Sequence, residues 1–339
     1  MQFLAFIRVA LVVAAIATPT ETDSSNANTS IGNGPFPSDL NGSNFTYTHP
    51  FKLFRFHSQG LPLKMAFIDL PPTAASTITT TKPQHVRYTH KKPTLTPKIA
   101  LLLRGINFCS VTWPVTATAL QKAGYRVVIP DQIGFCKSSK PCALYQFSLH
   151  QLALSTYSLL SALNLIDPHD SEITVIGHSL SGMLATRFSL IYPELVPKLA
   201  LVNPIGLEPY LELGVPYPDL SANLQTEQST YYLGAWAPEY EVWAMMLAQM
   251  YAGTEAQKFV EGHARVVDMV LTQPVFYELP RVRAHALLMV GTKDTTAIGK
   301  QWSPPDVQEK LEKYKDLGHA PQIQTPGRFH AALLRWLRA

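Results

Sequence analysis

The chain has 339 residues, a formal net charge of +4, and 46% hydrophobic against 15% charged residues. So much apolar material with so little charge excludes a chain that is disordered throughout, and it predicts a folded protein with a sizeable core. Lysine and arginine are scattered and form no basic run, so nucleic acid is not an expected partner. The length permits one large domain or two small ones.

The N-terminus predicts export. An apolar run over residues 9–17 follows Arg8 and ends in Ala15-Ile16-Ala17. We interpret residues 1–17 as a signal peptide, because the run is too short to span a bilayer stably and ends in a cleavage-type sequence. A buried N-terminal helix and a membrane anchor are the alternatives. We therefore expect a secreted protein with no stable membrane span after cleavage.

A polar leader, residues 18–48, follows the signal peptide. It contains three acceptor patterns for N-glycosylation, which begin at Asn28, Asn41 and Asn44. Three such patterns in one polar stretch support an extracellular protein.

The three cysteines, Cys109, Cys136 and Cys142, cannot all pair within one chain. A bridge between Cys136 and Cys142 would close a short loop, and three unpaired thiols are the alternative. Their spacing is not that of a metal site, so no metal is expected.

In chain order, two antiparallel strands come first, residues 51–57 and 61–70, and a Thr/Pro-rich surface loop follows over 71–97. Apolar runs of strand length then alternate with helical patterns. Uninterrupted apolar strands separated by helices imply a parallel sheet covered on both faces, so the fold class is α/β. The expected strands are 99–103, 125–129, 173–176, 199–202 and 286–290, and the expected helices are 112–124, 149–165, 180–192, 241–251 and 326–337.

This alternation is interrupted between residues 205 and 276, which are rich in aromatic residues. We interpret this stretch as a helical cap inserted between two parts of the core, 49–204 and 277–339. Such an insertion would lie above the carboxyl edge of the sheet, where open α/β sheets bind their ligands.

The chemistry centres on Ser179, which lies between a predicted buried strand and a predicted helix. A serine hydroxyl is a weak nucleophile unless it is held exposed near a base, and a strand-to-helix turn presents it at a helix N-terminus. Gly177 supplies the small residue that such a turn needs, whereas Ser181 stands where glycine is usual. Helix capping is the alternative role for Ser179.

Four segments closely resemble the α/β-hydrolase family, in the branch that contains esterases, epoxide hydrolases, dehalogenases and carbon–carbon bond hydrolases. The resemblance runs from about Phe51 to the C-terminus. It implies the α/β-hydrolase fold, with a mostly parallel central sheet, helices on both faces and a helical cap insertion. The segments are Ile173 to Gly182, Leu101 to Gly105, Gly124 to Phe135 and Leu317 to Pro321.

The resemblance implies a triad in which Ser179 attacks a carbonyl carbon, His319 moves the proton and Asp294 orients the imidazole. Backbone N–H groups of Leu180 and Ile106 would form the oxyanion hole. Neither a metal nor an organic cofactor is expected.

Three other polar residues have expected roles outside the triad. Glu208 is a minor alternative to Asp294 as the triad acid. Asp131 is expected to cap a loop, and His178 to be packed.

Four tryptophans are candidates for lining an apolar acyl pocket, although each fits core or cap packing equally well. They are Trp113, Trp236, Trp243 and Trp302. The expected partner is a small-molecule acyl substrate, and no pattern indicates an oligomeric state.

Two departures from the family pattern affect the site. Arg104 replaces the usual histidine, and it could either distort the oxyanion turn or bind an anionic substrate group. Residues 307–316 predict a charged helix with no apolar strand before His319, so the last strand is expected to be missing. That absence could put His319 out of reach of Ser179, and coding sequence wrongly removed as an intron would explain it as well as a true loss.

The expected function is secreted hydrolysis of a carboxylic ester or a related acyl bond through a covalent acyl-enzyme. Serine at the nucleophile position excludes the chemistry of the epoxide hydrolases and dehalogenases of this branch, which the resemblance implies use aspartate. Hydrolysis of a carbon–carbon bond beside a ketone would use the same triad. A non-catalytic binding protein that keeps the fold is the alternative from another class.

Overall fold

The computed structural model of the chain describes residues 47, 49–73, 98–141, 145–167, 172–212, 237–252, 255–291, 293–294, 312–314 and 317–339. Several predictions fall outside these residues. They are the signal peptide, the glycosylation sites Asn28, Asn41 and Asn44, most of the Thr/Pro-rich loop, Cys142, Trp236 and Trp302.

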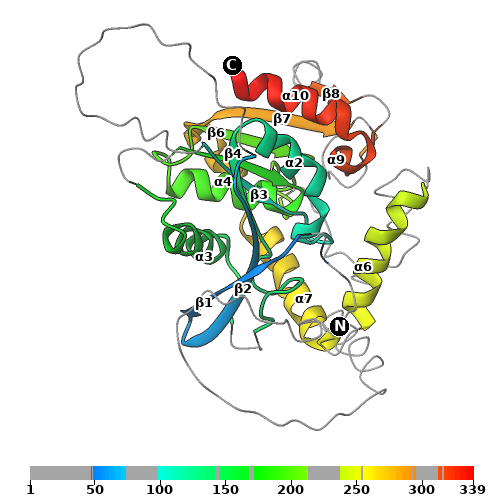
Figure 1. Ribbon diagram of the computed structural model, residues 1–339. Coiled ribbons are helices and arrows are strands. Elements are labelled where there is room, and N and C mark those ends of the chain that lie inside the picture. Colours follow the sequence, from blue (N-terminus) through cyan, green and yellow to red (C-terminus); the bar gives the residue numbers. More distant parts are fainter. Residues whose placement is uncertain are drawn as a thin grey trace, which may run out of the picture.

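One sheet of eight strands forms the centre of the described part of the chain (Figure 1), in the order β1-β2-β4-β3-β5-β6-β7-β8. β1 pairs antiparallel with β2, and β2 with β4, while all other neighbours are parallel. This confirms the antiparallel edge and the mostly parallel sheet. The strands are β1 (Lys52–Ser58), β2 (Leu61–Leu70), β3 (Lys98–Leu103), β4 (Tyr125–Pro130), β5 (Ile173–His178), β6 (Lys198–Val202), β7 (His285–Gly291) and β8 (Glu312–Tyr314).

Five of the helices lie close to the predicted ranges, while α7 and α9 had no predicted range of their own. The first of them, α2, begins at Pro114 and not at residue 112, because proline suits the first turn of a helix and residues 110–112 form a 3₁₀ turn. The helices are α2 (Pro114–Lys122), α3 (Leu149–Ala162), α4 (Leu180–Ile191), α6 (Glu241–Ala252), α7 (Ala256–Thr272), α9 (Pro321–Gln324) and α10 (Pro326–Arg338). None of them is long and apolar enough to cross a membrane.

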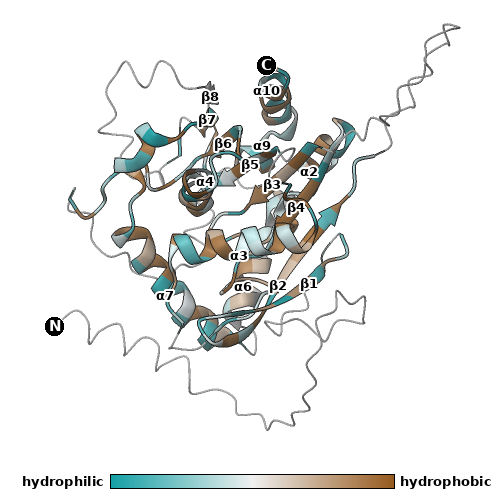
Figure 2. Cartoon of the chain, turned by 90° about the vertical axis from the view of Figure 1, so that its left-hand side faces the viewer, coloured by the Kyte–Doolittle hydropathy of each residue, from teal (hydrophilic) through white to brown (hydrophobic). Residues whose placement is uncertain are grey.

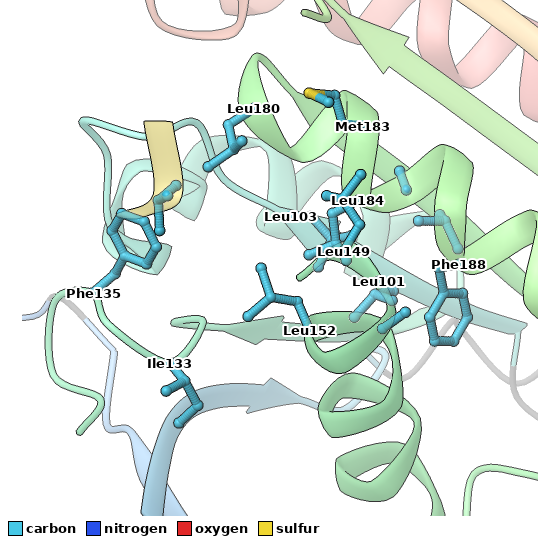
Figure 3. Close-up of a cluster of buried hydrophobic side chains, with 14 of the residues drawn as sticks. Leu101, Leu103, Ile133, Phe135, Leu149, Leu152, Leu180, Met183, Leu184 and Phe188 are labelled. Atoms are coloured by element: carbon cyan, nitrogen blue, oxygen red, sulfur yellow. The ribbon is translucent and has the colours of Figure 1, made fainter. Parts of the chain in front are cut away.

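The strands bury both faces. In β3, Leu101 and Leu103 belong to an apolar layer with α3 and α4, whereas Ala100 and Leu102 face the opposite layer with α2 and α10. This alternation follows from the two-residue period of a strand and explains why the core strands are continuous apolar runs. Figure 3 shows the first layer, in which the side chains of β3 lie near those of α3 and α4, including Leu149, Leu152, Leu184 and Phe188.

The helices differ in how much of their surface they bury (Figure 2): residues 180–189 of α4 are all buried, whereas α10 buries one apolar face. α10 shows the pattern clearly, because its buried residues follow the spacing of one face of an α-helix while Arg335 and Arg338 are exposed. The buried residues are Phe329, Ala332, Leu333, Trp336 and Leu337.

The strand before His319 is present, and the prediction that it is missing is wrong. β8 pairs parallel with β7, with Glu312 opposite Met289 and Tyr314 opposite Gly291. The predicted charged helix is therefore wrong for residues 312–314, while residues 307–311 lie outside the described ranges. A three-residue strand at the sheet edge forms through backbone pairing with one neighbour and needs no apolar run, so hydrophobic periodicity does not reveal it.

The disulfide also differs from the suggested pairing, because Cys109 is bonded to Cys136 with a Cα–Cα distance of 5.7 Å. Cys109 follows β3 and Cys136 follows β4. Since these strands are parallel neighbours, their following loops leave the same edge of the sheet and meet there. The bridge thus joins two loops that are 27 residues apart in sequence.

A peptide map under non-reducing conditions tests this pairing. We expect a cross-linked pair of peptides that contain Cys109 and Cys136, and alkylation of Cys142 without prior reduction. Closing a loop of this length should stabilise the fold by about 3–4 kcal/mol in the chain-entropy model, so reduction should lower the free energy of unfolding by that order. A cross-link between Cys136 and Cys142 would contradict the structure.

Candidate active site

Ser179 occupies a strained turn between β5 and α4. Its backbone angles are φ 55° and ψ −123°, a combination that is rare for a residue with a side chain. Three backbone hydrogen bonds hold it there: Ser179 N donates to Val202 O at 3.0 Å, and Ser179 O accepts from Gly182 N at 2.8 Å and from Ile205 N at 3.2 Å. The turn has the strand-to-helix geometry that presents a nucleophile.

Close packing around this turn depends on two glycines. A Cβ at Gly177 would lie 2.2 Å from the carbonyl oxygen of Ser181, and one at Gly182 would lie 2.4 Å from Cβ of Pro204. Ser181 is itself buried within α4 and fits. The close contact that was expected at position 181 is therefore found at Gly182, where α4 packs against Pro204.

Asp294 and His319 are brought together at the end of β7 and beyond β8. His319 Nδ1 lies 2.9 Å from Asp294 Oδ2, and both residues are 1% exposed. A carboxylate oxygen accepts the hydrogen bond, so the Nδ1 nitrogen carries the proton. In the neutral imidazole this leaves the lone pair on Nε2, which is the form a general base requires.

Asn203 anchors the loop that carries His319, and sequence reasoning missed it. This buried residue follows β6, and its Nδ2 donates to Gly318 O at 2.9 Å and to His319 O at 2.8 Å. Its Oδ1 accepts from Gly291 N at 2.7 Å. Its φ of 38° is one that asparagine tolerates better than most residues. The available signal was a polar residue directly after a buried apolar strand.

His178 is packed, as expected, and it also holds the same loop. Its Nε2 lies 2.8 Å from His319 O, and since a carbonyl can only accept, Nε2 is the donor. Burial, reinforced by the neighbouring His319, lowers the pKa of His178 to about 3. The ring is therefore neutral at physiological pH and keeps this hydrogen bond.

Further hydrogen bonds complete the support of the His319 loop. Lys293 N donates to Leu317 O at 3.1 Å, and Gly318 N donates to Gln324 Oε1 at 2.9 Å. The loop is thus held by β5, β6, β7 and α9 together, so a short β8 suffices to position His319.

The two predicted oxyanion donors come from two different elements. Leu180 is the first residue of α4, and Ile106 lies in the turn after β3. A Cβ at Gly105 would be 3.0 Å from Cβ of Ser179, so this turn passes directly beside the candidate nucleophile.

Asp131, the expected loop cap, and Glu208, the alternative triad acid, have other surroundings. Asp131 accepts from Ser110 N at 2.7 Å and from the Tyr47 hydroxyl at 2.6 Å, so it caps a loop as predicted. Glu208 is half-buried and, among the described residues, its Oε2 has no hydrogen-bond partner. Burial raises the pKa of Glu208 to about 7. The described geometry therefore pairs His319 with Asp294, the first choice for the triad acid.

Of the tryptophan candidates, two are described. Trp113 is 1% exposed and meets the ring of His178 edge-on at 6.3 Å, so it lies in the core behind the site. Trp243 of α6 is half-buried against the apolar layer of α3 and α4.

A groove of about 390 Å³ lies elsewhere, lined by residues 61–63, 138–141 and 255. Ser179, Asp294 and His319 do not line it, so we do not assign it to the substrate.

The comparisons with known proteins agree with this fold. A family model described as alpha/beta hydrolase fold matches residues 101–258. A crystal structure of a "probable hydrolytic enzyme" from Pseudomonas aeruginosa PAO1 is 41% identical with a TM-score of 0.73, over 87% of this chain and 96% of that one. The chain belongs to the alpha/beta hydrolase fold family.

Two curated relatives are more distant. Bifunctional epoxide hydrolase 2 of Sus scrofa is 25% identical over 61% of this chain, and the match spans only 34% of that protein's length. Lipase 1 of Psychrobacter immobilis is 25% identical over 62% of this chain and 68% of its own. These relatives support a hydrolase and leave the substrate undefined.

The substitution Asn203→Asp tests the anchor of the His319 loop. Aspartate keeps the backbone preference and the acceptor for Gly291 N, but when ionised it sets a carboxylate against two carbonyl oxygens. We expect the hydrolytic rate to fall by about 10- to 100-fold, as for a small misplacement of a catalytic group. Asn164→Asp is the matched control, because Asn164 also has a positive φ, of 53°, and is exposed. Equal rates for the two variants would argue against the anchor.

Glu208→Gln should change the pH dependence of stability and leave activity intact. Because the pKa of Glu208 is raised to about 7, the folded state keeps a proton that the unfolded state loses above about 4.5. Stability contributed by this group is therefore present below pH 4.5 and lost as the pH rises towards 7. The variant should match the native protein in urea unfolding at pH 4.5 and exceed it at pH 8.

The exposed Glu194→Gln serves as the control for this experiment. Loss of hydrolysis in folded Glu208→Gln would instead revive Glu208 as the triad acid.

Proposed function

We propose that this protein is a serine hydrolase that transfers the acyl group of a carboxylic ester, or of a related acyl compound, to water. The observation that carries the proposal is the buried hydrogen bond of 2.9 Å between His319 Nδ1 and Asp294 Oδ2. It prepares His319 Nε2 as a base at the sheet edge where the strained Ser179 lies.

In the proposed acylation step, Oγ of Ser179 attacks the carbonyl carbon while His319 Nε2 takes its proton. The carbonyl oxygen becomes an oxyanion, which accepts hydrogen bonds from the N–H groups of Ile106 and Leu180. When the tetrahedral intermediate collapses, the bond to the alcohol breaks and the imidazolium returns the proton to it.

Deacylation repeats these steps with water. His319 Nε2 removes a proton from water as its oxygen attacks the acyl carbon, and the second tetrahedral intermediate expels Ser179 Oγ, which recovers the proton. Asp294 stays ionised and stabilises each imidazolium. The acid product leaves with the enzyme restored, and the cycle uses no group beyond this chain and water.

The identity of the nucleophile supports acyl chemistry over epoxide opening. The family resemblance implies that epoxide hydrolases carry aspartate where this chain has Ser179, although one relative bears an epoxide hydrolase name. A serine at this point forms an acyl-enzyme with an ester, and His319 can then activate the water that cleaves it.

We further propose that the enzyme acts outside the cell. The signal-type sequence over residues 1–17 and the acceptor patterns at Asn28, Asn41 and Asn44 support this location. The bridge between Cys109 and Cys136 also suits an oxidising compartment.

Labelling with a fluorophosphonate probe tests the proposal. The native protein should be labelled at Ser179 and should hydrolyse p-nitrophenyl esters, whereas Ser179→Ala should do neither. Asp294→Asn should reduce kcat by about 10³- to 10⁴-fold, because it disturbs the tautomer that His319 needs. Residual ester hydrolysis by Ser179→Ala at the native rate would refute the assignment.

The same experiment separates the alternatives. Folded protein with an unlabelled Ser179 would favour a non-catalytic binding protein. A labelled protein that ignores the esters and cleaves a vinylogous diketone would favour carbon–carbon bond hydrolysis.

A further inference from the structure

Arg104 is a buried cation at the end of β3. Its side chain is 1% exposed, and its guanidinium carbon lies 3.7 Å from the centre of the Phe135 ring. Burial lowers the pKa of Arg104 to about 10, against the opposing effect of Asp131, so the group stays charged at neutral pH. Within the described part of the chain it forms no ion pair. A buried charge of this kind is costly, so its hydrogen bonds matter.

Those hydrogen bonds are made to the turn beside Ser179. Nη1 of Arg104 donates to Gly105 O at 2.7 Å and to Ile106 O at 3.3 Å. The carbonyl of Gly105 also accepts from Phe108 N at 3.2 Å. Two donors, one of them cationic, therefore hold this carbonyl.

The Gly105 carbonyl and the Ile106 N–H belong to one peptide group. In a planar trans peptide these two bonds point in opposite directions, so fixing the oxygen also fixes the direction of the N–H. A charged donor on the oxygen additionally polarises the peptide and strengthens the N–H as a donor. This peptide lies beside the candidate nucleophile, because a Cβ added to Gly105 would be 3.0 Å from Cβ of Ser179. Its orientation and polarisation can therefore act on the site.

We propose that Arg104 is a positioning residue that orients and polarises the Gly105–Ile106 peptide, so that the N–H of Ile106 stabilises the oxyanion in the transition state. This inference rests on the proposed function. It decides between the two roles expected for Arg104. The turn keeps its internal hydrogen bond from Phe108 N to Gly105 O, which argues against distortion. Nη1 of the guanidinium donates to backbone carbonyls. Nε is buried and has no hydrogen-bond partner within the described part of the chain. The side chain is only 1% exposed, which leaves an anionic substrate group little access to it.

The loop after β4 holds the guanidinium in place. Phe135 supplies the ring beneath Arg104, and its neighbour Cys136 is bonded to Cys109 in the oxyanion loop. The stacked, planar guanidinium therefore reaches the turn from a braced position. The more flexible ammonium group of a lysine would not reproduce both contacts.

The test begins with native protein whose turnover depends on Ser179, and it then compares Arg104→Met and Arg104→Lys on p-nitrophenyl butyrate. Loss of a whole oxyanion donor costs about 10²- to 10³-fold in kcat, so we expect a smaller loss of about 10- to 100-fold for Arg104→Met, with KM changed by less than about 3-fold. Arg104→Lys should recover part of the kcat, because it keeps the charge and one donor.

A second measurement reports the oxyanion hole directly. Affinity for an alkyl boronic acid, which forms a tetrahedral adduct with the serine, should fall in parallel with kcat/KM. Affinity for butyrate, the product, should stay unchanged.

Arg126→Met is the matched control. Arg126, on β4, lies away from the triad. Its Nε forms an ion pair with Oδ1 of Asp69, on β2, at 2.9 Å. Its loss should lower stability and leave kcat and KM as in the native protein.

Three results would overturn the inference while leaving the proposed function standing. One is a folded Arg104→Met with the native kcat. Another is a rise in KM confined to an ester with an acidic acyl group, such as p-nitrophenyl hemisuccinate, which would make Arg104 an anion-binding residue. The third is a native kcat in Arg104→Lys, which decides the question if Arg104→Met does not fold.

A native protein without Ser179-dependent turnover would instead refute the proposed function, and the inference with it. That result is visible before any Arg104 variant is measured.

Discussion

The parallel pairing of the central strands places their carboxyl ends at one edge of the sheet, and the candidate site depends on this constraint. Five neighbouring strands each deliver one polar residue there, directly after the strand or a few residues beyond it. Because parallel strands run in the same direction, residues far apart in sequence lie side by side at the carboxyl edge of the sheet. The residues are Arg104 after β3, Asp131 after β4, Ser179 after β5, Asn203 after β6 and Asp294 after β7.

The polar groups at this edge are buried, so their stability depends on hydrogen bonds to other parts of the protein. His178 stays neutral because burial lowers its pKa to about 3, and it gives its one proton to His319 O. Asn203 uses both its amide hydrogens and its oxygen on the loops around it. A buried polar group without partners would destabilise the fold, so the hydrogen bonds that position His319 also stabilise the protein.

The wrong prediction of a missing strand and the open question of the cysteine pairing share one cause. The strand β8 and the bridge between Cys109 and Cys136 both arise from contacts between neighbouring strands. Hydrophobic periodicity reports only what lies within one segment, and spacing along the chain suggested only a bridge from Cys136 to the nearby Cys142 or no bridge. Asn203 escaped notice for the same reason, because its importance lies in three contacts with other segments.

The sequence by itself determined the mostly parallel sheet and the places of its long strands along the chain, which follow from apolar runs. It also determined the segments that carry Ser179, Asp294 and His319, through local motifs and the family resemblance. Only the tertiary structure decided which carboxylate meets His319, how the turn after β3 accommodates Arg104 and what supports the His319 loop. Those outcomes depend on distances and hydrogen bonds between segments separated by many residues, and no local pattern encodes them.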